Sequence, residues 1–417
     1  MSTKLALSAA ANLRRIVNDN YLRAHQGAAA GKFVVWAAII VPLELLHGFD
    51  LVVCVPENHA AMCAARGVGA QQCQKAEAAG YSMDLCSYAR IDLGTALAGG
   101  EGSPSMGQPR PNLLISDNNN CSLLVKWFDA VQRMSGAGHF VIDAPFCYQP
   151  QRPADTRYLE GQLRAMIRAI EGLTGQRCDM DKVGQAMAYS DQACALWKKL
   201  LSLAQSRPAG ITAFDTFAHM APYITSLRGT KELVDHLRLL VDEIELNMAM
   251  GKCPVPDERY RLLWDNIAPW HQLRAMSSRL AGLGANIVSA TYTACLGSLE
   301  GRIDHYPYDG GDPLAYLARM QNFSVCPHGL ELRARAMAAL IERYGVDGVI
   351  FGSNRSCKVY SVMQMDLQRL MAARCGAPAV MIELDHADGR KYSEEAAFLR
   401  IEALLEAIDA GRTMPAA

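Results

Sequence analysis

Eight short apolar segments spread along the chain constrain its fold more than any other feature of the sequence. Continuous apolar runs of this kind are what a parallel sheet covered by helices on both faces requires. Stretches with apolar residues at helical spacing follow most of the runs, which is typical of an α/β protein. The expected strands are Phe33–Ile39, Leu51–Val55, Asn112–Ser116, His139–Asp143, Arg261–Trp264, Asn286–Ala290, Val346–Phe351 and Ala379–Leu384.

The middle of the chain has a different pattern. From Asp155 to about Met250 the apolar residues repeat at helical spacing without a convincing strand, and the Pro- and Gly-containing segment 251–256 ends this region. We therefore predict two Rossmann-like or flavodoxin-like α/β lobes with parallel sheets, joined by a helical region. The expected domains are an N-terminal helical arm (1–30), a first lobe (31–155), the helical region (156–256) and a second lobe (257–417).

Charge and hydropathy narrow the class of protein. The chain has 41 basic and 42 acidic residues without a basic stripe, so we expect no nucleic-acid partner. The apolar stretch 33–46 is shorter than the ~20 residues that span a bilayer, and Glu44 interrupts it. Arg14 and Arg15 stand where a signal peptide would be cleaved, which favours an amphipathic helix. We expect a soluble, cytoplasmic protein with no membrane partner.

Thirteen cysteines are unusual for such a protein, and three of them differ from the others in their surroundings. A disulfide framework is not expected in the cytoplasm, and most free cysteines are small buried hydrophobes. No Cys-x-x-Cys pair indicates a zinc ribbon or a thioredoxin-like site. Cys86, Cys121 and Cys357, however, lie where strands run out, and the last two lie in polar turns that lead into expected helices.

Such strand ends are where open α/β sheets place their ligands. Three thiolates that converge there could hold an iron–sulfur cluster with one iron open, and helix N-termini would lie beside the anionic group. Cys86 and Cys121 belong to the first expected lobe and Cys357 to the second, so the site is expected at the lobe interface. The flanking Arg355 and Lys358 are expected to lower the pKa of Cys357. The alternative is that all these cysteines pack in the core.

The segments that contain these cysteines resemble the three cluster-ligand segments of the 2-hydroxyacyl-CoA dehydratase and benzoyl-CoA reductase family. They are Asp84–Arg90, the strand that ends at Cys121 with the following Lys126–Phe128, and Val346–Lys358. Glu383–Asp388 extends the resemblance, which covers nearly the whole chain. The Ser-Asn-Arg-Ser-Cys-Lys sequence that ends at Lys358 is most similar to the larger-subunit type, the D-component of 2-hydroxyglutaryl-CoA dehydratase.

The resemblance implies a [4Fe–4S] cluster on Cys86, Cys121 and Cys357. It implies a homologous smaller cluster-bearing subunit as partner, and an ATP-dependent iron–sulfur activator that injects a low-potential electron. In the dehydratases this electron makes a ketyl radical of an acyl-CoA thioester, which then expels its hydroxyl group. In the reductases the electrons go to an aryl-CoA thioester. An assembly or electron-transfer protein on the same lobes is a third alternative. The chain has no Walker motif, so ATP hydrolysis is assigned to a partner.

Other polar residues are weaker candidates for the site. Glu57 and His59 follow an expected strand, and a carboxylate near the open iron could move the proton that this chemistry requires. An equally favoured interpretation is that Glu57 begins and caps the next helix. Cys147 and Cys326 also follow strand-like segments and could enlarge the site to a double-cubane cluster. The remaining cysteines are interpreted as packing residues: Cys54, Cys63, Cys73, Cys178, Cys194, Cys253, Cys295 and Cys375.

Overall fold

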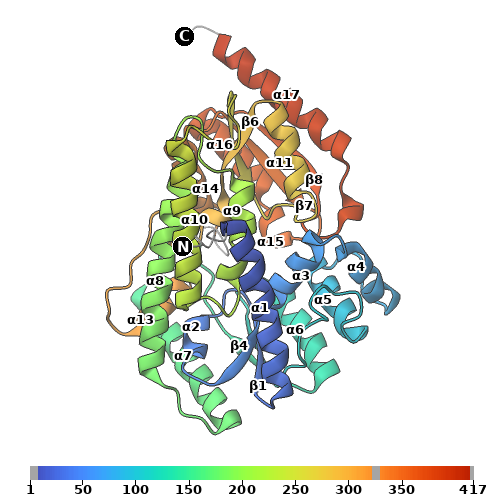
Figure 1. Ribbon diagram of the computed structural model, residues 1–417, viewed down its shortest axis with the longest axis vertical. Helices are drawn as coiled ribbons and strands as arrows, with labels where there is room; N and C mark the ends of the chain where they lie inside the picture. Colours follow the sequence, from blue (N-terminus) through green and yellow to red (C-terminus); the bar gives the residue numbers. More distant parts are fainter. Residues whose placement is uncertain (1–7, 322–328, 414–417) are drawn as a thin grey trace, which may run out of the picture.

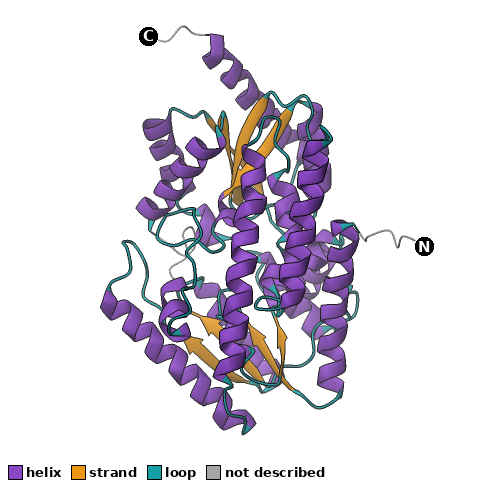
Figure 2. Ribbon diagram, turned by 60° about the vertical axis from the view of Figure 1, so that its left-hand side comes forward, coloured by secondary structure: helices purple, strands orange, loops and turns teal. Residues whose placement is uncertain are grey.

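Two four-stranded parallel sheets form the two ends of the molecule, with helices around and between them. The computed structural model describes residues 8–321 and 329–413. In Figure 1 the first sheet lies in the lower half and the second in the upper half, and Figure 2 shows both sheets with helices along their sides. The predicted fold class, two α/β lobes with parallel sheets, is confirmed.

The first sheet has the strand order β2-β1-β3-β4, and all neighbouring pairs are parallel. Val35, Leu114 and Ile115 are fully buried in it, because helices cover both faces. The strands are β1 (Phe33–Ala37), β2 (Leu51–Cys54), β3 (Leu113–Asp117) and β4 (Gly138–Ile142). The helices of this half include α1 (Ala9–Ala29), α2 (Leu43–Leu46), α3 (Pro56–Ala65), α4 (Gly69–Ala78), α5 (Ser87–Leu97) and α6 (Ser122–Ser135).

The second sheet repeats this topology with the order β6-β5-β7-β8. In both sheets the second strand of the chain pairs with one side of the first strand, and the third strand pairs with the other side. The chain therefore crosses over the sheet between its second and third strands. Its strands are β5 (Tyr260–Asp265), β6 (Ala285–Ala290), β7 (Gly348–Asn354) and β8 (Ala379–Leu384). The helices that follow β5 in the chain are α11 (Leu273–Gly282), α12 (Thr291–Ala294), α13 (Pro313–Met320), α14 (Leu330–Tyr344), α15 (Lys358–Ser361), α16 (Gln364–Cys375) and α17 (Glu394–Thr413), with the 3-10 turn η3 (Gly389–Lys391), and among them α13 lies in the lower half of Figure 1.

Helices join the two sheets. α8 and α10 pack against each other along one side of the molecule, and α1 packs on α10 (Figure 1). The fully buried Arg261 of β5 ties the second sheet to this region, since its guanidinium donates to the carbonyl oxygens of Ala204 and Ser206 at 2.6 and 3.0 Å. The elements are α7 (Pro153–Thr174), α8 (Met180–Ser202), η1 (Leu203–Gln205), α9 (Ala213–His219), η2 (Ala221–Ile224) and α10 (Lys231–Ala249).

The eight expected strands are all present, each within a few residues of its predicted bounds. The stretch from Asp155 to Met250 contains helices and no strand, as predicted. Arg14 and Arg15 lie within α1, which confirms a helix at this point. The four domain boundaries stay a prediction.

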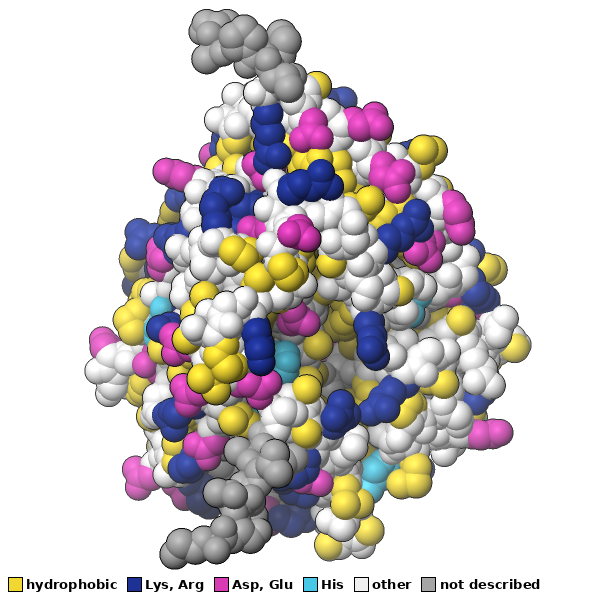
Figure 3. Space-filling model, turned by 45° about the horizontal axis from the view of Figure 1, so that its top comes forward, with side chains coloured by type: hydrophobic (Ala, Val, Ile, Leu, Met, Phe, Trp, Pro, Cys, Tyr) yellow, Lys and Arg dark blue, Asp and Glu magenta, His cyan; other side chains and the backbone are white. Residues whose placement is uncertain are grey.

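The surface carries mixed charges. On the face shown in Figure 3, lysine and arginine side chains lie among aspartate and glutamate side chains. Of the helices in the described ranges, none is long and apolar enough to cross a membrane.

Close packing of α5 on α4 fixes the helix that begins beside Cys86. A Cβ atom at Gly94 of α5 would lie 2.0 Å from the backbone oxygen of Gln72 in α4. We expect Gly94→Ala to lower the free energy of unfolding by about 2–3 kcal/mol, because backbone atoms must move apart. Denaturant unfolding would measure this loss. Gly161→Ala in α7 is the matched control, since nothing lies within 4 Å of its added Cβ, and it should be neutral or stabilising by up to about 1 kcal/mol. Equal effects of the two changes would contradict this account.

Candidate functional site

Each of the three singled-out cysteines is the residue that precedes the first turn of a helix. Cys86 precedes α5, Cys121 precedes α6 and Cys357 precedes α15. Unpaired backbone N–H groups and the positive end of the helix dipole lie at this position and favour an anion. Cys121 and Cys357 also occupy equivalent places in the two lobes, since each follows the third strand of its sheet.

The two lobes bring these cysteines to one cavity. Cys86, Cys121 and Cys357 all line the same cavity of about 140 Å³. Cys121 and Cys357 follow the strands at which each sheet crosses over, and this is the edge where doubly wound sheets bind ligands. The structure thus brings together three residues that the sequence places in three separate segments.

Burial keeps the three thiols neutral in the isolated chain. It raises the pKa of Cys86 and Cys121, and it raises the pKa of Cys357 to about 12. Backbone N–H groups of the first helical turns lower these pKa values, but by less than burial raises them. A metal group that binds the thiolates must therefore displace protons.

The expected effect of Arg355 and Lys358 on Cys357 is wrong. Arg355 is exposed and pairs with Glu383 at 2.5 Å, and the Lys358 ammonium donates to the Arg355 carbonyl oxygen at 2.9 Å. Both charges lie in solvent and do not offset the burial of the thiol, whose pKa is raised.

A hydrogen-bond network links the neighbours of two cysteines across the lobes. The Ser87 N–H donates to the Ser356 Oγ at 3.1 Å, and the Ser356 hydroxyl donates to the Asp385 carboxylate at 2.5 Å. Asp385 in turn accepts from two backbone N–H groups of the loop after β8. Ser87 adjoins Cys86 and Ser356 adjoins Cys357, so this serine network fixes how far apart the two cysteines lie.

His386 contacts Cys86 from the opposite lobe. Its Nε2 lies 3.6 Å from the Cys86 Sγ and 3.1 Å from the Ser87 Oγ. The ring is fully buried against the edge of Tyr88, with 4.4 Å between the ring centroids. Burial lowers the pKa of His386, so its imidazole is neutral. The residue orients the turn that carries Cys86.

Four charged residues join the same two lobes beside the serine network. Arg90 of α5 is buried and contacts Glu77 at 2.6 Å and Asp388 at 2.9 Å. Arg390 contacts the same two carboxylates at 2.6 and 2.7 Å. These hydrogen-bonded arginines lower the pKa of both Glu77 and Asp388. This inter-lobe ion network connects α4 and α5 with the loop after β8.

Glu57 lies in the cysteine-lined cavity, as its candidate role requires. Its Oε1 accepts a hydrogen bond from the Ile39 N–H at 3.0 Å, and its Oε2 has no partner among the described residues. Burial raises the pKa of Glu57 to about 7. Because Oε1 is already an acceptor, the proton of the neutral acid belongs on Oε2.

The structure does not bring His59 to this cavity. Two residues apart on α3, Glu57 and His59 lie on different faces of the helix. The fully buried His59 contacts Asp92 through Nδ1 at 3.1 Å and Ser103 through Nε2 at 2.9 Å. Burial opposes its charge, but the Asp92 carboxylate raises the pKa of His59 to about 10. His59 thus belongs to a polar cluster within the first lobe.

The other cysteine candidates are placed differently. Cys147 is buried after β4, with its Sγ 3.5 Å from the Pro145 carbonyl oxygen, and is not among the described residues lining the cavity. Cys326 lies outside the described residues. Cys295, interpreted as a packing residue, does line the cavity, but its thiol donates to the Tyr292 carbonyl oxygen at 2.8 Å.

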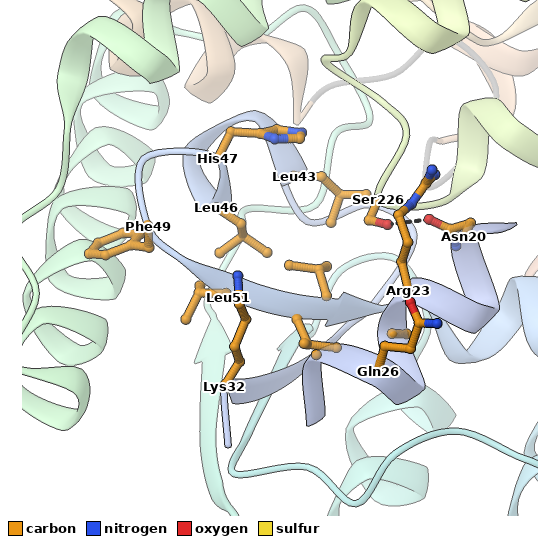
Figure 4. A pocket seen from close by; sticks show the side chains of 14 residues that line it. Asn20, Arg23, Gln26, Lys32, Leu43, Leu46, His47, Phe49, Leu51 and Ser226 are labelled. Carbon is orange, nitrogen blue, oxygen red and sulfur yellow. Dashed lines mark hydrogen bonds between the residues drawn. The ribbon is translucent and has the colours of Figure 1, made fainter. Parts of the chain in front are cut away.

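A larger cavity of about 540 Å³ lies between α1 and β2 (Figure 4). Two cations that line it are already paired, Arg23 with Glu232 at 2.9 Å and Lys32 with Asp50 at 2.5 Å. None of its described lining residues is a cysteine. We therefore take the cysteine-lined cavity as the candidate site.

Sequence reasoning assigned no role to Ser87, Ser356, Asp385 and His386. The signal that could have found them is a serine directly beside two of the three strand-end cysteines. Nothing in the sequence indicates that these serines pair, because they are 269 residues apart.

Comparison with known proteins gives the family. The family model of the 2-hydroxyglutaryl-CoA dehydratase D-component matches residues 38–408. The chain is 31% identical over 396 residues to the (R)-phenyllactyl-CoA dehydratase alpha subunit of Clostridium sporogenes, covering 94% of both chains. It is 30% identical over 403 residues to the (R)-2-hydroxyisocaproyl-CoA dehydratase alpha subunit of Clostridioides difficile, covering 95% of this chain and 96% of the relative.

A further relative is a benzoyl-CoA reductase subunit of Thauera aromatica, 27% identical over 410 residues, with 96% of this chain and 94% of the relative covered. These relatives are enzyme subunits. The chain belongs to the 2-hydroxyglutaryl-CoA dehydratase D-component family, and the resemblance identified from its cysteine segments is confirmed.

The raised pKa of Glu57 predicts a pH-dependent stability. The neutral acid is favoured in the fold, so its contribution is fully present below the unfolded value near 4.5 and is lost as pH rises through about 7. A shift of this size corresponds to about 3 kcal/mol. Between pH 5 and pH 8, Glu57→Gln should therefore gain up to about 3 kcal/mol of stability relative to the unsubstituted chain, measured by urea unfolding of the cofactor-free protein.

Glu383→Gln is the control for this experiment, because the Glu383 side chain is 63% exposed. Its stability relative to the unsubstituted chain should change little between the two pH values. A Glu57→Gln difference that is the same at pH 5 and pH 8 would show that Glu57 has an ordinary pKa.

Proposed function

We propose that this chain is the cluster-bearing subunit of a 2-hydroxyacyl-CoA dehydratase, with a [4Fe–4S] cluster on Cys86, Cys121 and Cys357. The observation that carries the proposal is the convergence of these three thiols, from two lobes, on one cavity. Membership of the dehydratase family supports the reaction class.

The residues at the cavity fit such a group. Within residues 8–321 and 329–413, no three His, Cys, Asp or Glu side chains are grouped tightly enough to hold a single metal ion. A cluster would instead be held by the three thiols of Cys86, Cys121 and Cys357, which line one cavity. Backbone N–H groups at the starts of α5, α6 and α15 would stabilise the anionic sulfurs of a bound cluster and tune its potential.

With Cys86, Cys121 and Cys357 as its ligands, a four-iron cluster would keep one iron without a protein ligand. When bound, the cluster would supply the low-potential electron that activates the CoA thioester. The chain's own residues would then hold and move the proton: Glu57, protonated on Oε2 near neutral pH, donates it to the departing hydroxyl group, which leaves as water. His386 and the serine network hold the turns of Cys86 and Cys357 in place.

The proposal includes two protein partners. The relatives are themselves named as subunits, which supports a second, homologous subunit that also carries a cluster. An ATP-dependent iron–sulfur activator would deliver the electron, because this chain has no Walker motif of its own. We place the complex in the cytoplasm. We assign no catalytic role to His59, and no double-cubane cluster to Cys147.

A benzoyl-CoA reductase subunit is the second candidate. The similarity to the Thauera aromatica reductase subunit and the apolar walls of the cavity favour it. The same cluster and partners would serve it, and the two candidates differ in the thioester that the complex converts. A non-catalytic electron-transfer protein would instead need a fully ligated cluster that is closed to exchange.

Cysteine substitutions test the ligand assignment. Anaerobically purified chain should be brown and contain about four irons with acid-labile sulfide. Cys121→Ser should lose most of this iron while circular dichroism shows an unchanged fold. Cys147→Ser, the matched control, should keep its iron, and full iron retention in Cys121→Ser would refute the assignment.

Ser356→Ala tests the serine network separately. It leaves all three thiols but leaves the Ser87 N–H without an acceptor. Iron release to a chelator should become several-fold faster. Ser122→Ala is the control, because Ser122 follows Cys121 but is exposed and lies outside the network. Equal release rates from the two variants would show that the network does not hold the site together.

Turnover by the anaerobic complex tests the reaction. With partner subunit, activator, ATP and a reductant, 2-hydroxyacyl-CoA thioesters should be dehydrated to enoyl-CoA products. Glu57→Gln should lower kcat about 10²–10⁴-fold with unchanged iron content, the range typical of a lost general acid. Reduction of benzoyl-CoA without any dehydration would favour the second candidate.

A further inference from the structure

Both lobes and the helical region contribute apolar residues to the described walls of the cysteine-lined cavity. They include the buried residues Ile40 and Trp127 in the first lobe, Met220 and Ile224 in the helical region, and Ile267 in the second lobe. Half-buried Leu296, after α12, completes this wall. A group that enters the cavity therefore contacts mostly hydrocarbon and aromatic surface.

The charged residues of the lining do not offer a partner to an anion. Besides His386, whose Nε2 already lies 3.1 Å from the Ser87 Oγ, the described lining includes Glu57 and Arg228 as ionisable side chains other than Cys and Tyr. Glu57 is itself an acid. Arg228 is the one lining cation among the described residues, so its surroundings decide whether a carboxylate could bind.

The Arg228 guanidinium already pairs with groups of the protein itself. Its Nη1 donates to the Ile39 carbonyl oxygen at 3.2 Å and its Nη2 donates to the Val41 carbonyl oxygen. Its Nε lies 3.3 Å from the Glu44 carboxylate, which neutralises the charge. The guanidinium thus closes the wall of the cavity and leaves no net positive charge for a ligand.

A second cavity, of about 60 Å³, adjoins the cysteine-lined cavity at Arg228. It shares Ile40, Arg228 and Leu296 with the first cavity, and Glu44 and Asp191 line it further on. An acyl side chain that reached this far with a carboxylate would meet these acidic groups. Burying an unpaired carboxylate is unfavourable, whereas burying an apolar group is favourable.

We infer that the acyl group accepted here carries an apolar alkyl or aryl side chain, and that side chains bearing a carboxylate are excluded. This inference rests on the proposed function in one respect: the acyl end of the CoA thioester must lie beside the three cysteines. Leu296 is a specificity-determining residue in this account, because it lines both cavities.

Binding of unreactive thioesters tests the inference independently of turnover. The complex of this chain with its partner subunit is titrated calorimetrically with 4-methylpentanoyl-CoA, 3-phenylpropanoyl-CoA and glutaryl-CoA, which lack the leaving hydroxyl. The first two should bind about 100-fold more tightly than glutaryl-CoA. Equal or tighter binding of glutaryl-CoA would overturn the inference, and so would failure of all three to bind.

A single substitution should change this preference. Leu296→Lys adds a cation at a half-buried position, so glutaryl-CoA should bind about 10-fold more tightly and the apolar thioesters more weakly. Leu399→Lys, at a residue of α17 that is 71% exposed, is the matched control and should bind all three as the unsubstituted chain does. An unchanged preference in Leu296→Lys would contradict its assigned role.

Turnover separates this inference from the proposed function. If 2-hydroxyglutaryl-CoA is dehydrated faster than the apolar 2-hydroxyacyl-CoA thioesters, the function stands and the inference fails. If the apolar thioesters bind more tightly but no 2-hydroxyacyl thioester is dehydrated, the inference stands and the proposed function fails.

Discussion

The hydrogen bond from the Ser87 N–H to the Ser356 Oγ is the interaction on which the rest of the site depends. Each serine adjoins a cysteine, the two serines belong to opposite lobes, and Asp385 holds the Ser356 hydroxyl in place. Separating the lobes here would leave buried polar groups unpaired, at about 1–3 kcal/mol for each group. The contact that positions one lobe on the other therefore also sets the spacing of the Cys86 and Cys357 thiols. The inter-lobe ion network of Glu77, Arg90, Asp388 and Arg390 reinforces it, since such buried pairs demand a defined geometry.

The low polarity of the cysteine-lined cavity affects both the proposed cluster and the proposed binding of the acyl group. Burial raises the pKa of the thiols and raises the pKa of Glu57 to about 7, so isolated anions are disfavoured in the cavity. Thiolates become acceptable where helix N-termini and a bound metal group compensate them. Among the described lining residues, a carboxylate on an acyl side chain would find no such compensation, because Arg228 is already paired with Glu44. The low polarity of the cavity therefore underlies both the cluster that we propose for this site and the preference for apolar acyl groups that we expect.

Much of the fold could be predicted because its signals are local. The strands are continuous apolar runs, and the inner strands β1, β3, β5 and β7 are buried on both faces, so their sequences show no alternation of apolar and polar residues. Cys121 and Cys357 could be singled out because polar turns follow the strands before them. Their meeting in one cavity was an expectation from the topology of parallel sheets, and the structure bears it out.

Other parts of the site could not be predicted because they depend on the direction in which side chains point and on contacts between distant segments. Glu57 and His59 follow the same strand, but about 200° of helical rotation separates them, so one faces the cavity and the other faces Asp92. Charges beside Cys357 in sequence have little effect on its thiol, because their long side chains extend into solvent. The sequence by itself determined two parallel sheets, the helical region between them and three cysteines at strand ends, because backbone hydrogen bonding and apolar burial follow local patterns. Only the tertiary structure decided that Ser87 meets Ser356, that His386 lies against Cys86 and that Arg228 carries no free charge, because these contacts join residues far apart in the chain.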